Sequence, residues 1–228
     1  MIAHRKRPVI AIDGPAGAGK STVAFRLAER LGFVLVDTGA LYRGVALSAR
    51  EAGIAWTDSE RLGPLTAALD LQFVRVPGGA PRLLIAGVDR SQDIRTSEIS
   101  MGASDVSKHE SVRAALLDLQ RRLGREGGVV LEGRDIGTVV FPDAEAKIFL
   151  TAAAEVRAQR RVHDLTQRGL PADFDQTLAE IRARDAQDSG RSVAPLRAAD
   201  DAITLDTTDL DIDAVVDRLA ELARAKGA

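Results

Sequence analysis

The chain has 228 residues, of which 45% are hydrophobic and 28% charged, so it is long enough for one ordinary globular domain with a substantial core. Lys and Arg number 31 against 33 Asp and Glu, and this balance gives no reason to expect a nucleic-acid or membrane partner. Cysteine is absent, which excludes disulfides and thiolate metal sites and fits a reducing compartment.

The N-terminal residues 1–7, MIAHRKR, are basic and precede an apolar run of about five residues, shorter than the roughly 7–15 of a signal peptide. A membrane span needs about 18 consecutive apolar residues, and the sequence contains no such stretch. We therefore expect residues 4–7 to form a solvated tail and the protein to be cytoplasmic.

Short apolar runs alternate with amphipathic stretches of helical period along most of the chain. In chain order, the expected elements are a strand at 9–12, a helix at 21–31, a strand at 34–36, helices at 41–52 and 112–123, strands at 129–131 and 148–150, helices at 155–167 and 176–185, a strand at 203–205 and a helix at 212–225. The strand runs are apolar throughout, so we expect them to be buried on both faces. Strand–helix alternation at this spacing predicts an α/β fold with a parallel sheet covered by helices on both sides.

One region departs from the alternation. Two β-like runs, at 71–76 and 82–86, flank a turn rich in glycine and proline at 77–81, and this pattern predicts an antiparallel hairpin. We expect residues of about 62–98 to form a small insertion within a single domain that spans residues 1–228. The polar stretch at 165–175, between two arginine-rich helices, is expected to form a second appendage.

The stretch GPAGAGKS at 14–21 fits the pattern G-x-x-x-x-G-K-[ST] and lies between a predicted buried strand and a predicted helix. Its glycines let successive backbone N–H groups point inward as an anion nest, and the following helix adds the positive end of its dipole. Lys20 can reach terminal phosphates, and the Ser21 hydroxyl can ligate Mg²⁺. The stretch therefore predicts a nucleotide-binding loop.

A Mg²⁺ site at such a loop usually needs a carboxylate from a neighbouring strand end. Glu132 follows the apolar run 129–131 and is the first choice. Asp13 and Asp37 also follow strands, so the sequence leaves the choice between these carboxylates open.

Arginines recur at the ends of the predicted elements. An acceptor that is itself a phosphate needs several fixed cations, and the planar guanidinium grips phosphate oxygens in pairs. Most single arginines are solvated surface residues. Arg134 differs because it follows a buried strand through Gly133 and is expected at the carboxyl edge of the sheet, where ligands of open α/β folds bind.

Longer stretches carry a resemblance to one family. They are IDGPAGAGKST at 12–22, VDTGALYRGVAL at 36–47, DIRTSEIS at 93–100, EGRDIGTVVFPDAEAKIFL at 132–150, RAQRR at 157–161 and RDAQDSGRSVAPL at 184–196. From Val9 to about Leu222 the chain resembles the bacterial cytidylate kinases, nucleoside monophosphate kinases with the P-loop NTPase fold. The phosphate loop alone is a weak mark of this family, whereas several long matches in the same order are a strong one.

The resemblance implies ATP-dependent phosphorylation of CMP or dCMP with Mg²⁺. The implied ATP-binding residues are Gly14, Pro15, Ala16, Gly17, Ala18, Gly19, Lys20, Ser21, Thr22, Arg160 and Arg161. The implied CMP-binding residues are Thr38, Arg43, Ser104, Arg113, Arg134, Asp135, Arg184, Asp188 and Arg191. The resemblance also implies a lid at about 160–175 and a CMP-binding role for the insertion at about 62–98.

Roles within this pocket follow from the same resemblance. Lys20, Arg134, Arg184 and Arg191 are the implied catalytic residues, with Lys20 neutralising the transferred charge. Arg43, Arg113 and Arg134 are implied to contact the acceptor phosphate and base, and Thr38, Ser104 and Arg113 the cytosine edge. Asp188 with Arg184 is implied to hold the ribose, while Ser21 and Glu132 are the implied Mg²⁺ residues.

The residues at 184–191 also allow plainer interpretations. Arg184 and Asp188 can form an ordinary i,i+4 surface ion pair, and Gly190 is expected to end the helix so that Arg191 lies on the next loop. Asp135 can simply orient Arg134. Three positions depart from the frequent family pattern: Glu132 for aspartate, Thr38 for serine and Ser21 for glycine.

Two other functions compete with this one. A kinase of the same fold could accept UMP, AMP, dTMP or a compound that is not a nucleotide. A nucleotide-dependent switch predicts a guanine-selecting N-K-x-D motif, which the sequence lacks. We expect a monomer, because lid closure needs freedom of movement, with no nucleic-acid or membrane partner.

Overall fold

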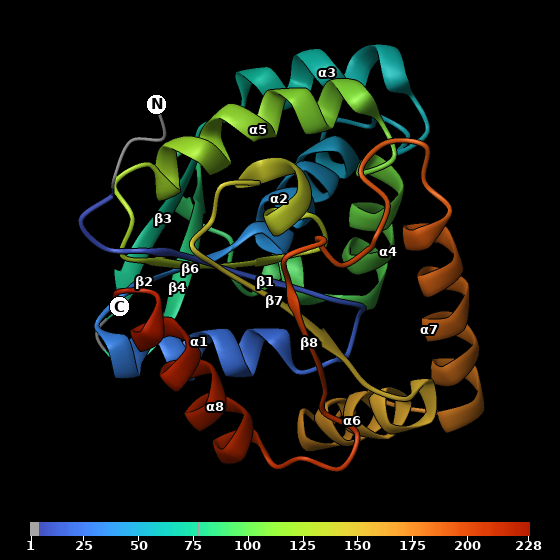
Figure 1. Cartoon of the computed structure of the whole chain (residues 1–228). Coiled ribbons are helices and arrows are strands. Elements are labelled where there is room, and N and C mark those ends of the chain that lie inside the picture. The colour runs from blue at the N-terminus through green and yellow to red at the C-terminus, as the bar shows by residue number, and fades with distance from the viewer. Residues whose placement is uncertain (1–4, 77) are drawn as a thin grey trace.

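The computed structural model of the chain describes residues 5–76 and 78–228. Its centre is a five-stranded parallel sheet in the order β2-β6-β1-β7-β8 (Figure 1). The strands are β1 (Val9–Asp13), β2 (Val34–Asp37), β6 (Val129–Gly133), β7 (Ala146–Thr151) and β8 (Ile203–Asp206). Each of the expected apolar runs therefore forms a strand of the α/β fold, and the predicted parallel sheet is confirmed.

The central strands distribute their side chains between two hydrophobic clusters. In β1, Ile10 and Ile12 pack with helices α1 (Lys20–Leu31) and α8 (Ile212–Ala225), whereas Val9 and Ala11 pack on the other face with residues of β6 and of the turn at Ile136–Val140. This alternation follows from the two-residue period of a strand. The sheet is thus covered on both sides, as expected.

The expectation of burial on both faces is wrong for the edge strands. Val34 of β2 is 44% exposed, and in β8 only Leu205 is buried, while Ile203 is 40% exposed. Leu205 is the residue of β8 that reaches the cluster beneath α1 and α8. An edge strand has a neighbour on one side only, so less of it is covered by the layers of the core.

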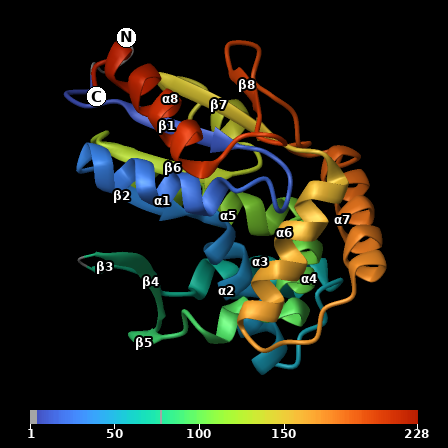
Figure 2. The same cartoon turned by 90° about the horizontal axis from the view of Figure 1, so that it is seen from below.

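A second, antiparallel sheet is formed by β3 (Leu71–Val76), β4 (Gly79–Ile85) and β5 (Val88–Asp89). The predicted hairpin is confirmed, although β4 begins three residues earlier than expected, and Pro77 of its turn lies outside the described residues. Figure 2 shows this sheet as a separate layer beside α2 (Thr38–Glu51). That residues 62–98 act as an insertion stays a prediction.

Two helices were not anticipated from the sequence: α3 (Ser59–Ala68) and α4 (Ser97–Val106). They pack with α2 and α5 (Glu110–Gly124) in a third hydrophobic cluster that includes Leu62 and Ile99. The helices α6 (Ala154–Gln167) and α7 (Phe174–Ser189) lie side by side at one edge of the molecule (Figures 1 and 2). Helix α7 ends before Gly190, so Arg191 lies on the following loop, as predicted.

The expectation of a solvated tail is wrong for Arg5, which is half-buried, whereas Lys6 and Arg7 are exposed as expected. Arg5 forms an ion pair with Asp143 at 2.7 Å, and Arg7 donates to the carbonyl of Leu31 at 2.7 Å. Leu31 is the last residue of α1, where carbonyls lack helical partners and attract cations. His4 lies outside the described residues. Within residues 5–76 and 78–228, no helix has the length and apolar character needed to cross a membrane.

Candidate functional site

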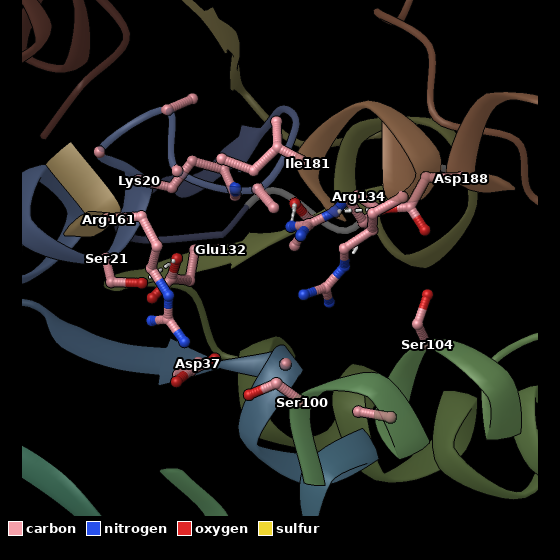
Figure 3. A pocket seen from close by; sticks show the side chains of 18 of the residues that line it. Lys20, Ser21, Asp37, Ser100, Ser104, Glu132, Arg134, Arg161, Ile181 and Asp188 are labelled. Carbon is pink, nitrogen blue, oxygen red and sulfur yellow. Dashed lines mark hydrogen bonds and ion pairs between the residues drawn. The ribbon is translucent and has the colours of Figure 1, made fainter. Parts of the chain in front are cut away.

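A cavity of about 890 Å³ lies at the carboxyl ends of the parallel strands (Figure 3). Every residue of the predicted CMP pocket lines it: Thr38, Arg43, Ser104, Arg113, Arg134, Asp135, Arg184, Asp188 and Arg191. So do these predicted ATP and metal residues: Ala16, Gly17, Ala18, Gly19, Lys20, Ser21, Thr22, Glu132, Arg160 and Arg161. The fold therefore brings the predicted residues, spread over 176 positions from 16 to 191, to one place.

The phosphate loop connects β1 to α1. Gly14 has a φ of 147°, and a Cβ at this position would lie 2.0 Å from the carbonyl oxygen of Leu150, so only glycine fits. Gly14 and Pro15 are outside the cavity lining, but the Pro15 carbonyl accepts a hydrogen bond from Lys20 Nζ at 2.7 Å. Burial and the charge of Arg134 lower the pKa of Lys20 to about 7. An anion bound at the loop would favour the charged ammonium.

The three carboxylates that the sequence left open as metal residues differ in their contacts. Asp13 is fully engaged, because its two oxygens each accept a backbone N–H, from Ile136 and Gly137, at 2.8 Å. Asp37 caps α2 and binds Arg43 at 2.7 Å. Both therefore have structural partners already.

Glu132 differs from both of these carboxylates, because one of its oxygens is still available to bind a ligand. Its Oε2 accepts from the Ser21 hydroxyl at 2.8 Å, while its buried Oε1 has no hydrogen-bond partner among the described residues. Burial, reinforced by the charge of Asp37, raises the pKa of Glu132 to about 7. A hydroxyl and an unpaired carboxylate oxygen are suitable hard ligands for Mg²⁺. The described residues contain no cluster of three or more metal-ligating side chains, so water and phosphate oxygens would complete the shell.

Asp188 is the centre of an arginine cluster on the other side of the cavity. Its Oδ2 accepts from Arg134 Nε at 2.9 Å, its Oδ1 pairs with Arg191, and Arg184 Nε lies 4.0 Å from Oδ2. Burial opposes ionisation of Asp188, but the three arginines outweigh it and lower the pKa of the carboxyl. Burial and Arg134 lower the pKa of Arg184 to about 10. One carboxylate for three guanidinium groups leaves a positive excess that suits an anionic ligand.

A second buried ion pair lies in the wall of the cavity. Arg113 of α5 forms an ion pair with Asp135, and its guanidinium lies 5.7 Å from the centre of the Tyr42 ring. The Thr38 hydroxyl donates to the carbonyl of Glu132 at 2.7 Å, so it holds the end of β6. The ion pair and the contact with the Tyr42 ring hold Arg113 and Asp135 in place.

The two arginines expected at the start of the lid behave differently. Arg160 donates to the carbonyl of Thr207 at 2.6 Å and is thereby tied to the residue after β8. Arg161 extends from α6 into the cavity towards Asp37 (Figure 3). That residues 160–175 form a mobile lid stays a prediction.

Sequence reasoning missed several residues of the site. Arg157 is buried behind the phosphate loop, donates to the Ala16 carbonyl at 3.0 Å and pairs with Asp185 at 2.6 Å. Its place in the RAQRR stretch was a signal, but nothing local distinguished it from Arg160. Gln187, which donates to Ser104 at 2.7 Å, was also missed, as was an apolar part of the lining formed by Leu210, Ile212 and Val215.

Comparisons with known proteins agree on one family. A family model described as cytidylate kinase matches residues 10–225. A cytidylate kinase of Syntrophotalea carbinolica is 53% identical over 214 residues, 94% of this chain and 91% of the relative. A cytidylate kinase of Pseudomonas aeruginosa strain UCBPP-PA14 is 49% identical over 221 residues, 96% of each chain. The crystal structure of an uncharacterized protein from Eubacterium ventriosum has a TM-score of 0.51 at 13% identity, covering 96% of this chain and 99% of that one, which supports the fold alone.

Proposed function

The chain belongs to the cytidylate kinase family, and we propose that it transfers the γ-phosphoryl group of ATP to CMP or dCMP, giving ADP and CDP or dCDP. The observation that carries the proposal is the cavity that joins the phosphate loop to the arginine cluster around Asp188. A nucleotide-dependent switch needs only the first of these anion sites, whereas a kinase with a phosphate acceptor needs both.

We assign the phosphate-loop side of the cavity to ATP. The backbone N–H groups of the loop and the start of α1 favour phosphate oxygens, and Lys20 adds a positive charge next to them. Leu210, Ile212 and Val215 offer apolar surface in the same cavity for the adenine ring. The Arg157 pair with Asp185 supports the loop from behind and connects it to α7.

We assign the arginine side to the acceptor nucleotide. Arg134, Arg184 and Arg191 carry the positive excess that its phosphate would neutralise, and Asp188 orients at least Arg134 and Arg191. Arg113 and Ser104 lie in the cavity wall where the base can be read. The predicted contact of Asp188 with the ribose stays a prediction, since this carboxylate is 1% exposed and is already surrounded by arginines.

Ser21 and Glu132 are the residues that would hold Mg²⁺. When bound there, the ion would supply charge neutralisation and orientation for the ATP phosphates. The Ser21 hydroxyl is already oriented by Glu132, and Thr38 holds the carbonyl of Glu132 in turn. This supporting contact from α2 keeps the end of β6 in register with the loop.

The reaction needs no covalent enzyme intermediate and no general base, because the attacking group is already a phosphate anion. The obstacles are repulsion between two anions and competition from water. The arginines and Lys20 offset the repulsion, and closure of the proposed lid and of the 62–98 region would exclude water. A monomeric state, a cytoplasmic location and the absence of a nucleic-acid or membrane partner stay predictions.

A coupled ADP-release assay tests the proposal. ATP and Mg²⁺ are supplied with CMP, dCMP, UMP, AMP or dTMP as the acceptor, and kcat/KM is compared across the panel. We expect the highest values with CMP or dCMP. A clear preference for AMP, or slow ATP hydrolysis that CMP does not change, would contradict the proposal.

A further inference from the structure

Gln187 and Ser104 form a hydrogen bond between two walls of the cavity. Gln187 lies on α7, directly before Asp188, and its Nε2 donates to Ser104 Oγ on α4 at 2.7 Å. Both residues line the cavity, Ser104 is 7% exposed and Gln187 is half-buried. The proposed mechanism assigns Ser104 to the base and gives Gln187 no role.

This hydrogen bond determines what Ser104 can offer to a ligand. A serine hydroxyl has one proton to donate and two lone pairs that can accept. Because Gln187 donates, a lone pair of Ser104 is used and its proton is left without a protein acceptor among the described residues. The hydroxyl is therefore available to the cavity as a hydrogen-bond donor.

Ser104 lies in the part of the cavity that is away from the phosphate loop. Figure 3 shows Lys20, Ser21 and Glu132 on one side, Arg134 and Asp188 further along, and the Ser104 side chain pointing into the space beyond. An acceptor whose phosphate meets the arginines and faces the phosphate loop would extend its base away from that loop. The α4 wall that carries Ser104 is on that far side.

Cytosine and uracil differ at ring position 3 in a way that such a donor can sense. Cytosine has an unprotonated nitrogen there, which accepts, whereas uracil has an N–H group, which donates. A fixed donor can therefore pair with the ring nitrogen of cytosine, whereas in uracil it faces the N–H group, which is another donor. In a buried site, a polar group left unpaired costs on the order of 10- to 100-fold in relative affinity.

We propose that Gln187 is a specificity-determining positioning residue, which holds Ser104 as a donor and thereby favours CMP over UMP. The proposal rests on the proposed function, because it takes the acceptor to be a pyrimidine nucleotide with its base at α4. It also adds to that function, since it assigns the choice of base to a residue that acts through another side chain.

The test changes the direction of this one hydrogen bond. In Gln187→Glu the carboxylate can only accept, so the Ser104 proton turns towards it and an oxygen lone pair faces the cavity, which suits the N–H of uracil. In Gln187→Met the hydroxyl has no partner and can rotate to serve either base. CMP and UMP compete in one reaction with ATP, and the ratio of CDP to UDP formed gives the ratio of their kcat/KM values, independent of how much enzyme is correctly folded.

We expect the CMP:UMP ratio to fall about tenfold or more in Gln187→Glu and by a smaller factor in Gln187→Met. Ser104→Ala should lower the ratio as well, and adding Gln187→Met to it should cause no further change, because the two residues act through one contact. Gln92→Glu is the matched control: it makes the same charge change at an exposed residue outside the cavity lining and should keep the wild-type ratio.

An unchanged CMP:UMP ratio in both Gln187 variants, with wild-type enzyme active on CMP, would overturn the role of Gln187 and leave the proposed function intact. If Gln187→Glu does not fold, as judged by its circular dichroism melt, the Gln187→Met ratio and the double variant decide the question. Wild-type enzyme that prefers a purine nucleotide would overturn the proposed function, and this inference with it.

Discussion

Replacement of Asp188 by asparagine is expected to lower the free energy of unfolding by about 3–5 kcal/mol at neutral pH. The carboxylate is 1% exposed, bonds to Arg134 and Arg191, and lies 4.0 Å from Arg184. Asparagine keeps nearly the same shape but not the charge. Three guanidinium groups would then face one another in a half-buried cluster without a counter-ion. Their mutual repulsion, and not a loss of side-chain packing, is the source of the destabilisation.

The pH dependence of this contribution has a definite sign. The arginines overcome burial and hold the pKa of Asp188 below its ordinary value of 3.8 in the folded protein. A carboxyl group with a depressed folded pKa stabilises the fold above its unfolded pKa, and this stabilisation is lost as the pH falls through the folded value. The difference between wild type and Asp188→Asn should therefore be constant at pH 5–8 and shrink below about pH 4.

Urea denaturation followed by far-UV circular dichroism measures the difference, with and without sulfate. Sulfate carries the kind of charge that the acceptor phosphate would bring, so it should stabilise Asp188→Asn more than wild type. Asp200→Asn is the matched control, since Asp200 is exposed, and its effect should stay within about 0.5 kcal/mol. A loss below about 1 kcal/mol in Asp188→Asn, with no extra response to sulfate, would refute the idea that Asp188 holds the cluster together.

Three other substitutions test separate parts of the site and core. Arg134→Ala should lower kcat/KM for CMP by about 10³-fold while the melting curve stays cooperative, because the proposed mechanism assigns this arginine to the acceptor phosphate; turnover near wild type would contradict this assignment. Glu132→Gln should raise the Mg²⁺ concentration for half-maximal activity about tenfold, and an unchanged Mg²⁺ titration would count against this ligand. Leu27→Ala should cost about 2–5 kcal/mol in urea denaturation, because Leu27 is fully buried between α1 and the sheet, whereas the exposed Leu170→Ala should cost little.

The elements that could be predicted from the sequence were those with strong local patterns. The strands and the helices around them have apolar residues at clear periods, and these positions are buried in the structure. Helices α3 and α4 have weaker patterns: α3 contains Pro64, and α4 is rich in serine and other small residues. Tertiary packing of Leu62 and Ile99 against α2 stabilises them, and no short window of sequence contains that information.

The candidate site, too, could be predicted from the sequence only in part. The residue types at Lys20, Glu132 and Arg134 indicated phosphate and metal chemistry from sequence, but not which carboxylate was available. Asp13 and Glu132 both lie near the carboxyl ends of parallel strands, and their availability differs because backbone groups 123 and 124 positions away occupy the oxygens of Asp13. The pair of Arg184 with Asp188 could be expected from their spacing, whereas the bond of Asp188 to Arg134, 54 positions away, could not.

The sequence by itself therefore determined the phosphate loop, the strand–helix alternation and, through long matching stretches, the family, since these depend on neighbouring residues in the chain. Only the tertiary structure decided which charged groups are already paired and which face the cavity. The physical reason is that hydrogen bonds and charge pairs act over a few ångströms in space, and contacts such as Ser21 with Glu132 join residues 111 positions apart. Local pattern specifies the elements, and their packing decides which side chains remain available for chemistry.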